Sequence, residues 1–163
     1  MKRLNALIYR ALQGLLALLM IVLMIPVILQ IGSRLTEATP HYPWTEEAAR
    51  FLFIWIIMIG AAIAVRDGSH FHLDVLPKPK TQAGKVIARL IVHAAMLIMA
   101  LTFVAFGWQF ALFGNDQESD LLGLNMLWIH IAWPGAGVVF TLFLLEKLVA
   151  DVKRPRRDGY EPR

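Results

Sequence analysis

Residues 11–32 read ALQGLLALLMIVLMIPVILQIG, an apolar run without a charged side chain. A helix rises about 1.5 Å per residue, so about 20 residues cross a hydrocarbon core about 30 Å thick. The run exceeds the roughly 7–15 apolar residues typical of a cleaved signal peptide, and no Ala-x-Ala site follows it. We therefore expect a retained transmembrane helix, kinked toward its outer end by Pro26.

Three further apolar runs follow along the chain, at residues 51–65, 90–115 and 121–145. The first of these three reaches spanning length only if its helix begins near Trp44. Strands do not fit these lengths, because a barrel strand crosses a membrane with about 10 residues of alternating polarity. The sequence therefore predicts an all-α membrane protein with four transmembrane helices. The expected helices are roughly residues 11–32, 44–66, 88–114 and 122–147, in one domain of residues 1–152.

Composition supports the membrane class, because 58% of the residues are hydrophobic and only 17% are charged. Soluble domains carry about 25% charged residues. The chain contains no cysteine, which excludes disulfides, thiolate zinc sites and iron–sulfur clusters. The net charge of +4 does not indicate nucleic-acid binding, because the basic residues lie beside the apolar runs.

Lysine and arginine are distributed unequally between the two sides of the expected bundle. The N-terminal flank, the second connection and the tail together carry 14 basic residues, whereas the first connection carries two and the third none. Because basic residues are enriched in cytoplasmic segments, we expect both termini in the cytoplasm (N-in, C-in). The outer loops are then short and acidic. Residues 153–163 form a basic tail that we expect to be disordered.

The second apolar run is preceded by residues 43–50, which read PWTEEAAR. Thr45 is a candidate N-cap, and acidic residues at the next two positions suit the positive end of a helix. Arg50 lies four residues after Glu46 and three after Glu47, so an ion pair within the helix is expected. The segment is either a well-formed helix start at the membrane surface or a polar contact point for a partner.

Histidines raise the question of a bound cofactor or metal. His93 is expected near the cytoplasmic end of the third helix and His130 near the outer end of the fourth. Their rings should therefore lie about 15–20 Å apart along the bundle, too far for one haem. In the second connection, His70 and His72 precede Asp74, but a metal site would need further ligands in fixed geometry. An interfacial loop is the alternative.

Small residues cluster at residues 60–64 and again at residues 135–137. Such faces let helices approach closely, either within the chain or against another subunit. We find no catalytic triad, no phosphate-binding glycine loop and no internal repeat of the kind that complete secondary transporters carry. No enzyme activity and no cofactor are expected.

Residues 44–66, WTEEAARFLFIWIIMIGAAIAVR, resemble the small membrane subunit of tripartite ATP-independent periplasmic (TRAP) transporters. The loop that follows has the family's pattern in Gly68, His70, His72, Asp74 and Leu76. The sequence Trp133-Pro134-Gly135 in the fourth run is similar to the family's late proline–glycine pattern. By this resemblance, the candidate interface and structural residues are Trp44, Glu46, Glu47, Arg50, Gly60, Arg66, His70, Asp74 and Pro134.

The resemblance implies a subunit of the bacterial inner membrane, surrounded by lipids, with two protein partners. A separate large permease would carry the substrate and ion sites, and a periplasmic binding protein would capture an organic acid. An ion gradient, commonly sodium, would drive import. The small subunit would scaffold the large one and help to form the docking surface. Two alternatives are a small oxidoreductase that binds haem or quinone and a homodimeric exporter, which would need a buried acidic residue in an early helix.

Overall fold

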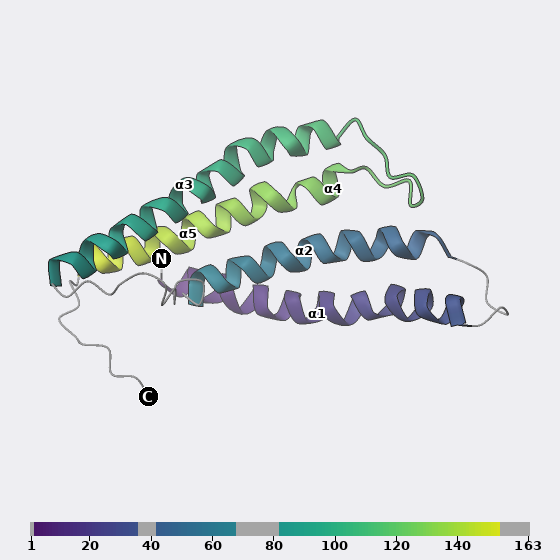
Figure 1. The fold of residues 1–163 in the computed structure, drawn as a ribbon, viewed down its shortest axis with the longest axis horizontal. Coiled ribbons are helices and arrows are strands. Elements are labelled where there is room, and N and C mark those ends of the chain that lie inside the picture. The colour runs from purple at the N-terminus through teal and green to yellow at the C-terminus, as the bar shows by residue number, and fades with distance from the viewer. Residues whose placement is uncertain (1, 36–41, 68–81, 154–163) are drawn as a thin grey trace.

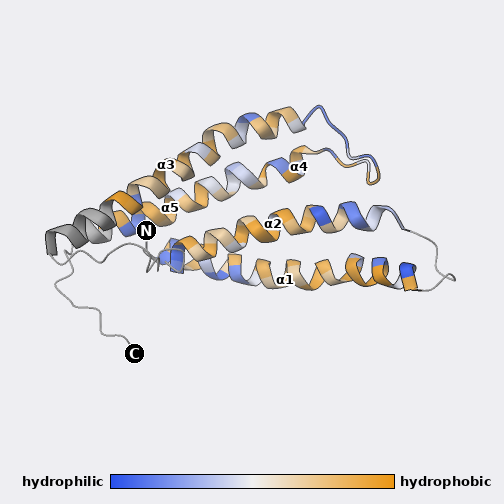
Figure 2. Cartoon of the chain, viewed as in Figure 1, coloured by the Kyte–Doolittle hydropathy of each residue, from blue (hydrophilic) through white to orange (hydrophobic). Residues whose placement is uncertain are grey.

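The computed structural model describes residues 2–35, 42–67 and 82–153. Its helices are α1 (Lys2–Leu35), α2 (Trp44–Asp67), α3 (Gln82–Gly114), α4 (Leu127–His130) and α5 (Ala132–Lys153). Within these residues four helical segments are long and apolar enough to cross a membrane, with α4 and α5 forming the fourth together. The predicted all-α membrane fold is therefore confirmed. Figure 2 shows apolar residues along all four spans.

Three of the helix starts differ from their expected positions. α1 begins at Lys2 rather than at residue 11, and α3 begins at Gln82 rather than at residue 88. Hydropathy locates the hydrocarbon region, whereas a helix continues into the polar interface beyond it. α4 begins at Leu127, so residues 122–126, which we expected to be helical, lie in the preceding loop.

The fourth span is interrupted between α4 and α5. α4 is a single turn, and Ile131 separates it from α5. Pro134 is the cause, because it has no backbone N–H to donate and its ring crowds the carbonyl of His130 four residues earlier. The helical pattern resumes at Gly135, whose N–H donates to the carbonyl of Ile131 at 3.1 Å.

The spans form two antiparallel hairpins, α1 with α2 and α3 with α5, and these lie side by side through α2 and α5 (Figure 1). Along the described residues the backbones of α2 and α3 do not approach each other closely. The beginning of α1 and the end of α5 lie at the same end of the bundle. The core is formed where α2, α3 and α5 meet, and its most enclosed large side chains are Phe143 and Leu144.

Close backbone approach holds the second hairpin together. A Cβ atom on Gly137 would lie 2.9 Å from the Phe103 Cβ, and one on Gly107 would lie 3.0 Å from the Pro134 nitrogen. These glycines are therefore required by internal packing. Gly60 and Gly135 differ, because a Cβ on either would meet nothing within 4 Å. The two small-residue clusters thus serve internal packing only in part.

Candidate functional site

Thr45 lies in the first turn of α2, at the end of the bundle that we expect to face outward, and is 1% exposed. Its hydroxyl donates to the carbonyl of Tyr42 at 2.7 Å, and its backbone N–H donates to the same oxygen at 3.2 Å. α2 already begins at Trp44, so the expectation that Thr45 caps the helix is wrong. The residue instead ties the first turn of α2 to the segment before it.

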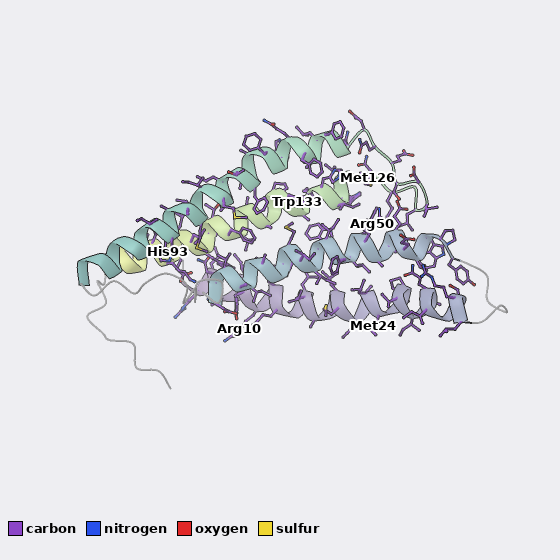
Figure 3. All side chains as sticks on the ribbon, in the orientation of Figure 1. Arg10, Met24, Arg50, His93, Met126 and Trp133 are labelled. Carbon is purple, nitrogen blue, oxygen red and sulfur yellow. The ribbon has the colours of Figure 1, made fainter. Side chains whose placement is uncertain are left out.

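Glu46 and Arg50 form the ion pair expected within α2. The Arg50 Nη2 lies 3.6 Å from the Glu46 Oε1, and both side chains are about two-thirds exposed, at 65% and 66%. An exposed pair at this spacing contributes little to stability, about 0.3–0.5 kcal/mol. The guanidinium therefore stands at the surface, where Figure 3 places it toward the same end of the bundle as Met126.

Glu47 has a different role, which local spacing did not reveal. Its Oε2 accepts hydrogen bonds from the backbone N–H groups of Leu121 and Leu122, at 3.0 and 2.9 Å. These residues belong to the loop between α3 and α4. A carboxylate that accepts two backbone N–H groups forms charge-assisted bonds, which are stronger than neutral ones. Glu47 therefore fixes the outer loop to the beginning of α2.

The outer loop is also ordered from within. The Asn125 side chain donates to the carbonyl of Asn115 at 2.7 Å and accepts from the N–H of Leu127 at 2.8 Å. The N–H of Ser119 donates to the carbonyl of Leu124 at 2.9 Å. Gly123 has φ of +62°, a conformation that disfavours other residues. Residues 115–126 therefore form a compact loop despite their leucines.

A second contact joins α2 to the same region. The indole N–H of Trp55 donates to the backbone carbonyl of Trp128 in α4 at 3.1 Å. Pro134, which interrupts the helix, lies six residues after Trp128. Backbone carbonyls next to such an interruption lack a helical N–H donor and need another one. Glu47 at the outer end of α2 and Trp55 about midway along it together bind the first hairpin to the second.

Arg66 lies at the opposite, inner end of α2. Its guanidinium donates to the backbone carbonyl of Asn5 in α1. The same group lies 4.5 Å from the centre of the Tyr9 ring and 5.3 Å from that of the Phe143 ring. A cation held between two aromatic faces is stabilised by their quadrupoles. Arg66 thereby links α1, α2 and α5.

Three further side-chain contacts complete this inner cluster. The Asn5 amide donates to the Glu146 carboxylate of α5 at 2.5 Å, and the Tyr9 hydroxyl donates to Asp67 at 2.7 Å. The Lys147 ammonium donates to the carbonyl of Val65 at 2.7 Å. Of these residues only Arg66 is a candidate from the sequence alone, because the partners come from three separate helices.

The two intramembrane histidines are far apart. His130 is 9% exposed, its ring centre lies 4.0 Å from that of Phe110, and a Cβ on Gly114 would lie 2.1 Å from its Nδ1. His93 precedes Gly114 by 21 residues on α3, which places it about 30 Å along the helix from His130. This exceeds the separation we expected, so these two histidines do not form a pair of haem ligands.

The remaining candidates are Trp44, His70 and Asp74. Trp44 is 37% exposed at the outer surface and makes an edge contact with Tyr42, with ring centres 6.3 Å apart. His70 and Asp74 lie outside the described residues. Within residues 2–35, 42–67 and 82–153, no group of three His, Asp or Glu side chains is placed to hold a metal ion. The polar side chains at the two ends of the bundle connect helices and loops to one another.

Comparison with known proteins identifies the family. Residues 23–154 match the family described as tripartite ATP-independent periplasmic transporters, DctQ component. The chain is 29% identical over 119 residues to the sialic acid TRAP transporter small permease protein of Vibrio cholerae, covering 73% of this chain and 68% of the relative. It is 26% identical over 138 residues to the C4-dicarboxylate TRAP transporter small permease protein of Pseudomonas aeruginosa, covering 81% of this chain and 65% of the relative.

A third relative is the isethionate TRAP transporter permease protein DctMQ of Oleidesulfovibrio alaskensis. It is 31% identical over 96 residues, which cover 59% of this chain and 15% of the relative. The chain spans about two-thirds of the length of the Vibrio cholerae and Pseudomonas aeruginosa small permeases. Together with four spans of the required length, these matches identify the chain as a small permease subunit of the DctQ family of TRAP transporters, a multi-pass component of the bacterial inner membrane.

Proposed function

We propose that this subunit is a scaffold that supports a separate large permease and helps a periplasmic binding protein to dock. The observation that carries the proposal is the attachment of the two hairpins to each other at both membrane surfaces. Glu47 joins them at the outer end, Trp55 joins them about midway along α2, and Asn5 and Lys147 join them at the inner end. Such polar ties restrict movement of the hairpins relative to each other, as a scaffold requires.

The outer loop supports a docking role. Asp116, Glu118 and Asp120 are exposed there, beside Leu121 and Leu124, which are 52% and 45% exposed. The loop is held in one conformation by the Glu47 carboxylate, and a pre-ordered surface loses less conformational entropy on binding. An acidic rim around exposed leucines suits a protein partner with basic groups around an apolar patch.

We further propose that the complete transporter imports an organic acid with an ion gradient, commonly sodium. The relatives are named for sialic acid, C4-dicarboxylates and isethionate, all of which are anions at neutral pH. The substrate and ion sites are expected in the large permease. In agreement, the groove between α2, α3 and α5 is lined by apolar side chains, so it offers no polar groups to an anion.

Reconstitution in proteoliposomes tests the proposal. The large permease and the binding protein, with and without this chain, are assayed for uptake of labelled succinate, sialic acid and isethionate under an inward sodium gradient. We expect uptake of one of these acids only when all three proteins are present. Isothermal titration of this chain alone with that acid should give no heat of binding. Saturable micromolar binding, or full uptake without this chain, would contradict a scaffold role.

A further inference from the structure

His130 lies in the outer half of the bundle, and one of its ring nitrogens has no hydrogen-bond partner. The side chain is 9% exposed, and its Nδ1 is the one buried side-chain nitrogen or oxygen without a partner in the part of the chain that the structure describes. A Cβ atom on Gly114 would clash with this nitrogen, so the backbone of α3 fills the space in front of it. A buried polar atom without a partner is rare in proteins and needs a physical reason.

The enclosed position suits the neutral imidazole. A neutral ring with its proton on Nε2 leaves only a lone pair on Nδ1, which can face the Cα of Gly114. Protonation places an N–H there and a charge on the ring. The backbone and the aromatic face of Phe110 favour the charged ring in part, since the two ring centres lie 4.0 Å apart. Burial opposes the charged ring, because it loses its hydration and its Nδ1 N–H has no acceptor.

Two of the three helices packed against α4 carry no charge near this ring. α4 packs against α3, α5 and α2. α3 carries no Asp, Glu, Lys or Arg from Ile91 to Gly114, and α5 carries none before Glu146 toward its inner end. His93, the other titratable side chain on this part of α3, lies about 30 Å along the helix from His130.

The charged groups on the outer part of α2 and in the loop before α4 are engaged elsewhere or exposed. These residues are Glu46, Glu47, Arg50, Asp116, Glu118 and Asp120. Glu46 pairs with Arg50, Glu47 accepts the N–H groups of the loop, and the three loop carboxylates are exposed. None of them accepts a hydrogen bond from the Nδ1 of His130 in the described residues.

His130 ends a hydrogen-bonded outer unit, residues 115–130, which comprises the loop and α4. The N–H of His130 donates to the carbonyl of Met126 within this unit at 3.1 Å. Pro134 has no N–H to offer the His130 carbonyl, so α4 is separated from α5. Because its ring packs on Phe110 and Gly114, His130 seats the outer unit on α3.

We propose that His130 is a pH-sensitive latch: the neutral ring seats the outer unit on α3, and the protonated ring leaves its pocket and releases the unit. An imidazole in water takes up its proton below about pH 6.5, whereas the seated ring excludes it. The released form therefore binds more protons, so the seated form loses stability as the pH falls below about 6.5. Any effect on docking rests on the docking role proposed above, whereas the latch itself uses only residues of this chain.

Distance measurements between two nitroxide labels test the latch in the full-length chain in lipid nanodiscs. The chain contains no cysteine, so labels can be attached to Glu46→Cys on α2 and Leu124→Cys in the loop, both at exposed positions. We expect one narrow distance distribution at pH 7.5 and a second, broader one at pH 5.5. The ratio of released to seated units should rise about tenfold between these conditions, because the proton-linked ratio changes about tenfold over one pH unit below about 6.5. Asp and Glu contribute little there, since they titrate near about pH 4.

Two variants and one further measurement isolate the contribution of this ring. His130→Gln should give a distribution that does not change with pH, whereas His93→Gln should respond as the wild type. Ring nitrogen shifts of the histidine-labelled wild type need no change to the pocket. They should show a neutral His130 with its proton on Nε2 at pH 7.5 and an imidazolium at pH 5.5. The latch is overturned by a wild-type distribution that is the same at both pH values, by a pH response that persists in His130→Gln, or by an imidazolium at pH 7.5.

Discussion

The Oε2 atom of Glu47 lies 2.9 Å from the backbone nitrogen of Leu122, a residue 75 positions later in the chain. The same oxygen accepts the N–H of Leu121. Glu46, its neighbour, pairs with Arg50 on the same helix. Adjacent carboxylates thus perform different tasks, since one stabilises the tertiary structure and the other stands at the surface.

Glu47→Ala is expected to lower the unfolding temperature, because two backbone N–H groups lose a charged acceptor. Thermal unfolding in detergent, followed by tryptophan fluorescence, measures the loss, and residues 115–126 should become more sensitive to protease. Glu46→Ala is the matched control and should change stability by less than about 0.5 kcal/mol. Equal effects of the two substitutions would show that the loop contact contributes nothing.

Gly114→Ala should destabilise the chain by about 1–3 kcal/mol, because the added methyl group would meet the buried His130 ring. Gly135→Ala, in open space on α5, should change stability by less than about 0.5 kcal/mol. Unfolding temperatures of both variants check the difference. Adding His130→Ala to Gly114→Ala should relieve part of the penalty, and a purely additive double variant would argue against the contact.

A double-mutant cycle addresses the inner cluster. The effects of Tyr9→Leu and Arg66→Gln on stability are expected to be less than additive in the double variant, because each removes the same cation–π contact. Thermal unfolding of the single and double variants provides the four values. Tyr9→Leu combined with Arg34→Gln, at the far end of α1, should be additive within about 0.5 kcal/mol. If the stability effects were additive in both cycles, the contact between Arg66 and Tyr9 would not stabilise the chain.

Arg50→Glu should leave the stability of the isolated chain nearly unchanged, because the Glu46–Arg50 ion pair that it removes is exposed. We expect it to reduce co-purification of the large permease on a tagged small subunit, since Arg50 remains our candidate for contact between subunits. Arg34→Glu, also exposed at the outer end, is the control. If Arg50→Glu left the complex intact but abolished uptake, Arg50 would act in the transport cycle instead.

Topology reporters examine the orientation. Fusions at Pro40 and Gln117 are expected to read periplasmic, and fusions at Lys80 and Arg163 cytoplasmic, because 14 of the 16 basic residues lie on the latter side. A cytoplasmic signal at Gln117 would reverse the assignment of the acidic loop. It would also remove the basis for a docking surface there.

Hydropathy alone was sufficient to predict four spans, because the hydrocarbon core requires long uncharged runs. It could not locate the start of the fourth helix. Leu121, Leu122 and Leu124 extend the apolar run, yet Gly123 at φ +62° and the side chain of Asn125 turn the backbone there. These are conformational and hydrogen-bonding effects, to which a hydropathy average is insensitive.

The same distinction applies to the candidate sites. The Glu46–Arg50 pair follows from spacing on one helix, so sequence was enough to predict it. The contacts of Glu47 with the outer loop and of Asn5 with Glu146 join residues 74 to 141 positions apart. Such pairs depend on how the hairpins pack against each other, and short-range sequence spacing carries no information about that packing. Roles for His70 and Asp74 remain predictions.

The long separation between Glu47 and its loop partners also bears on biosynthesis. A ribosome adds about 5–20 residues per second, so at least 75 residues of further synthesis, roughly 4–15 s, separate the emergence of the carboxylate from that of Leu122. Through that interval the first hairpin is inserted while Glu47 has no loop to bind. Closure of this contact therefore requires that synthesis has passed α3 and reached the loop after it, and a nascent chain arrested before Leu121 would still lack it.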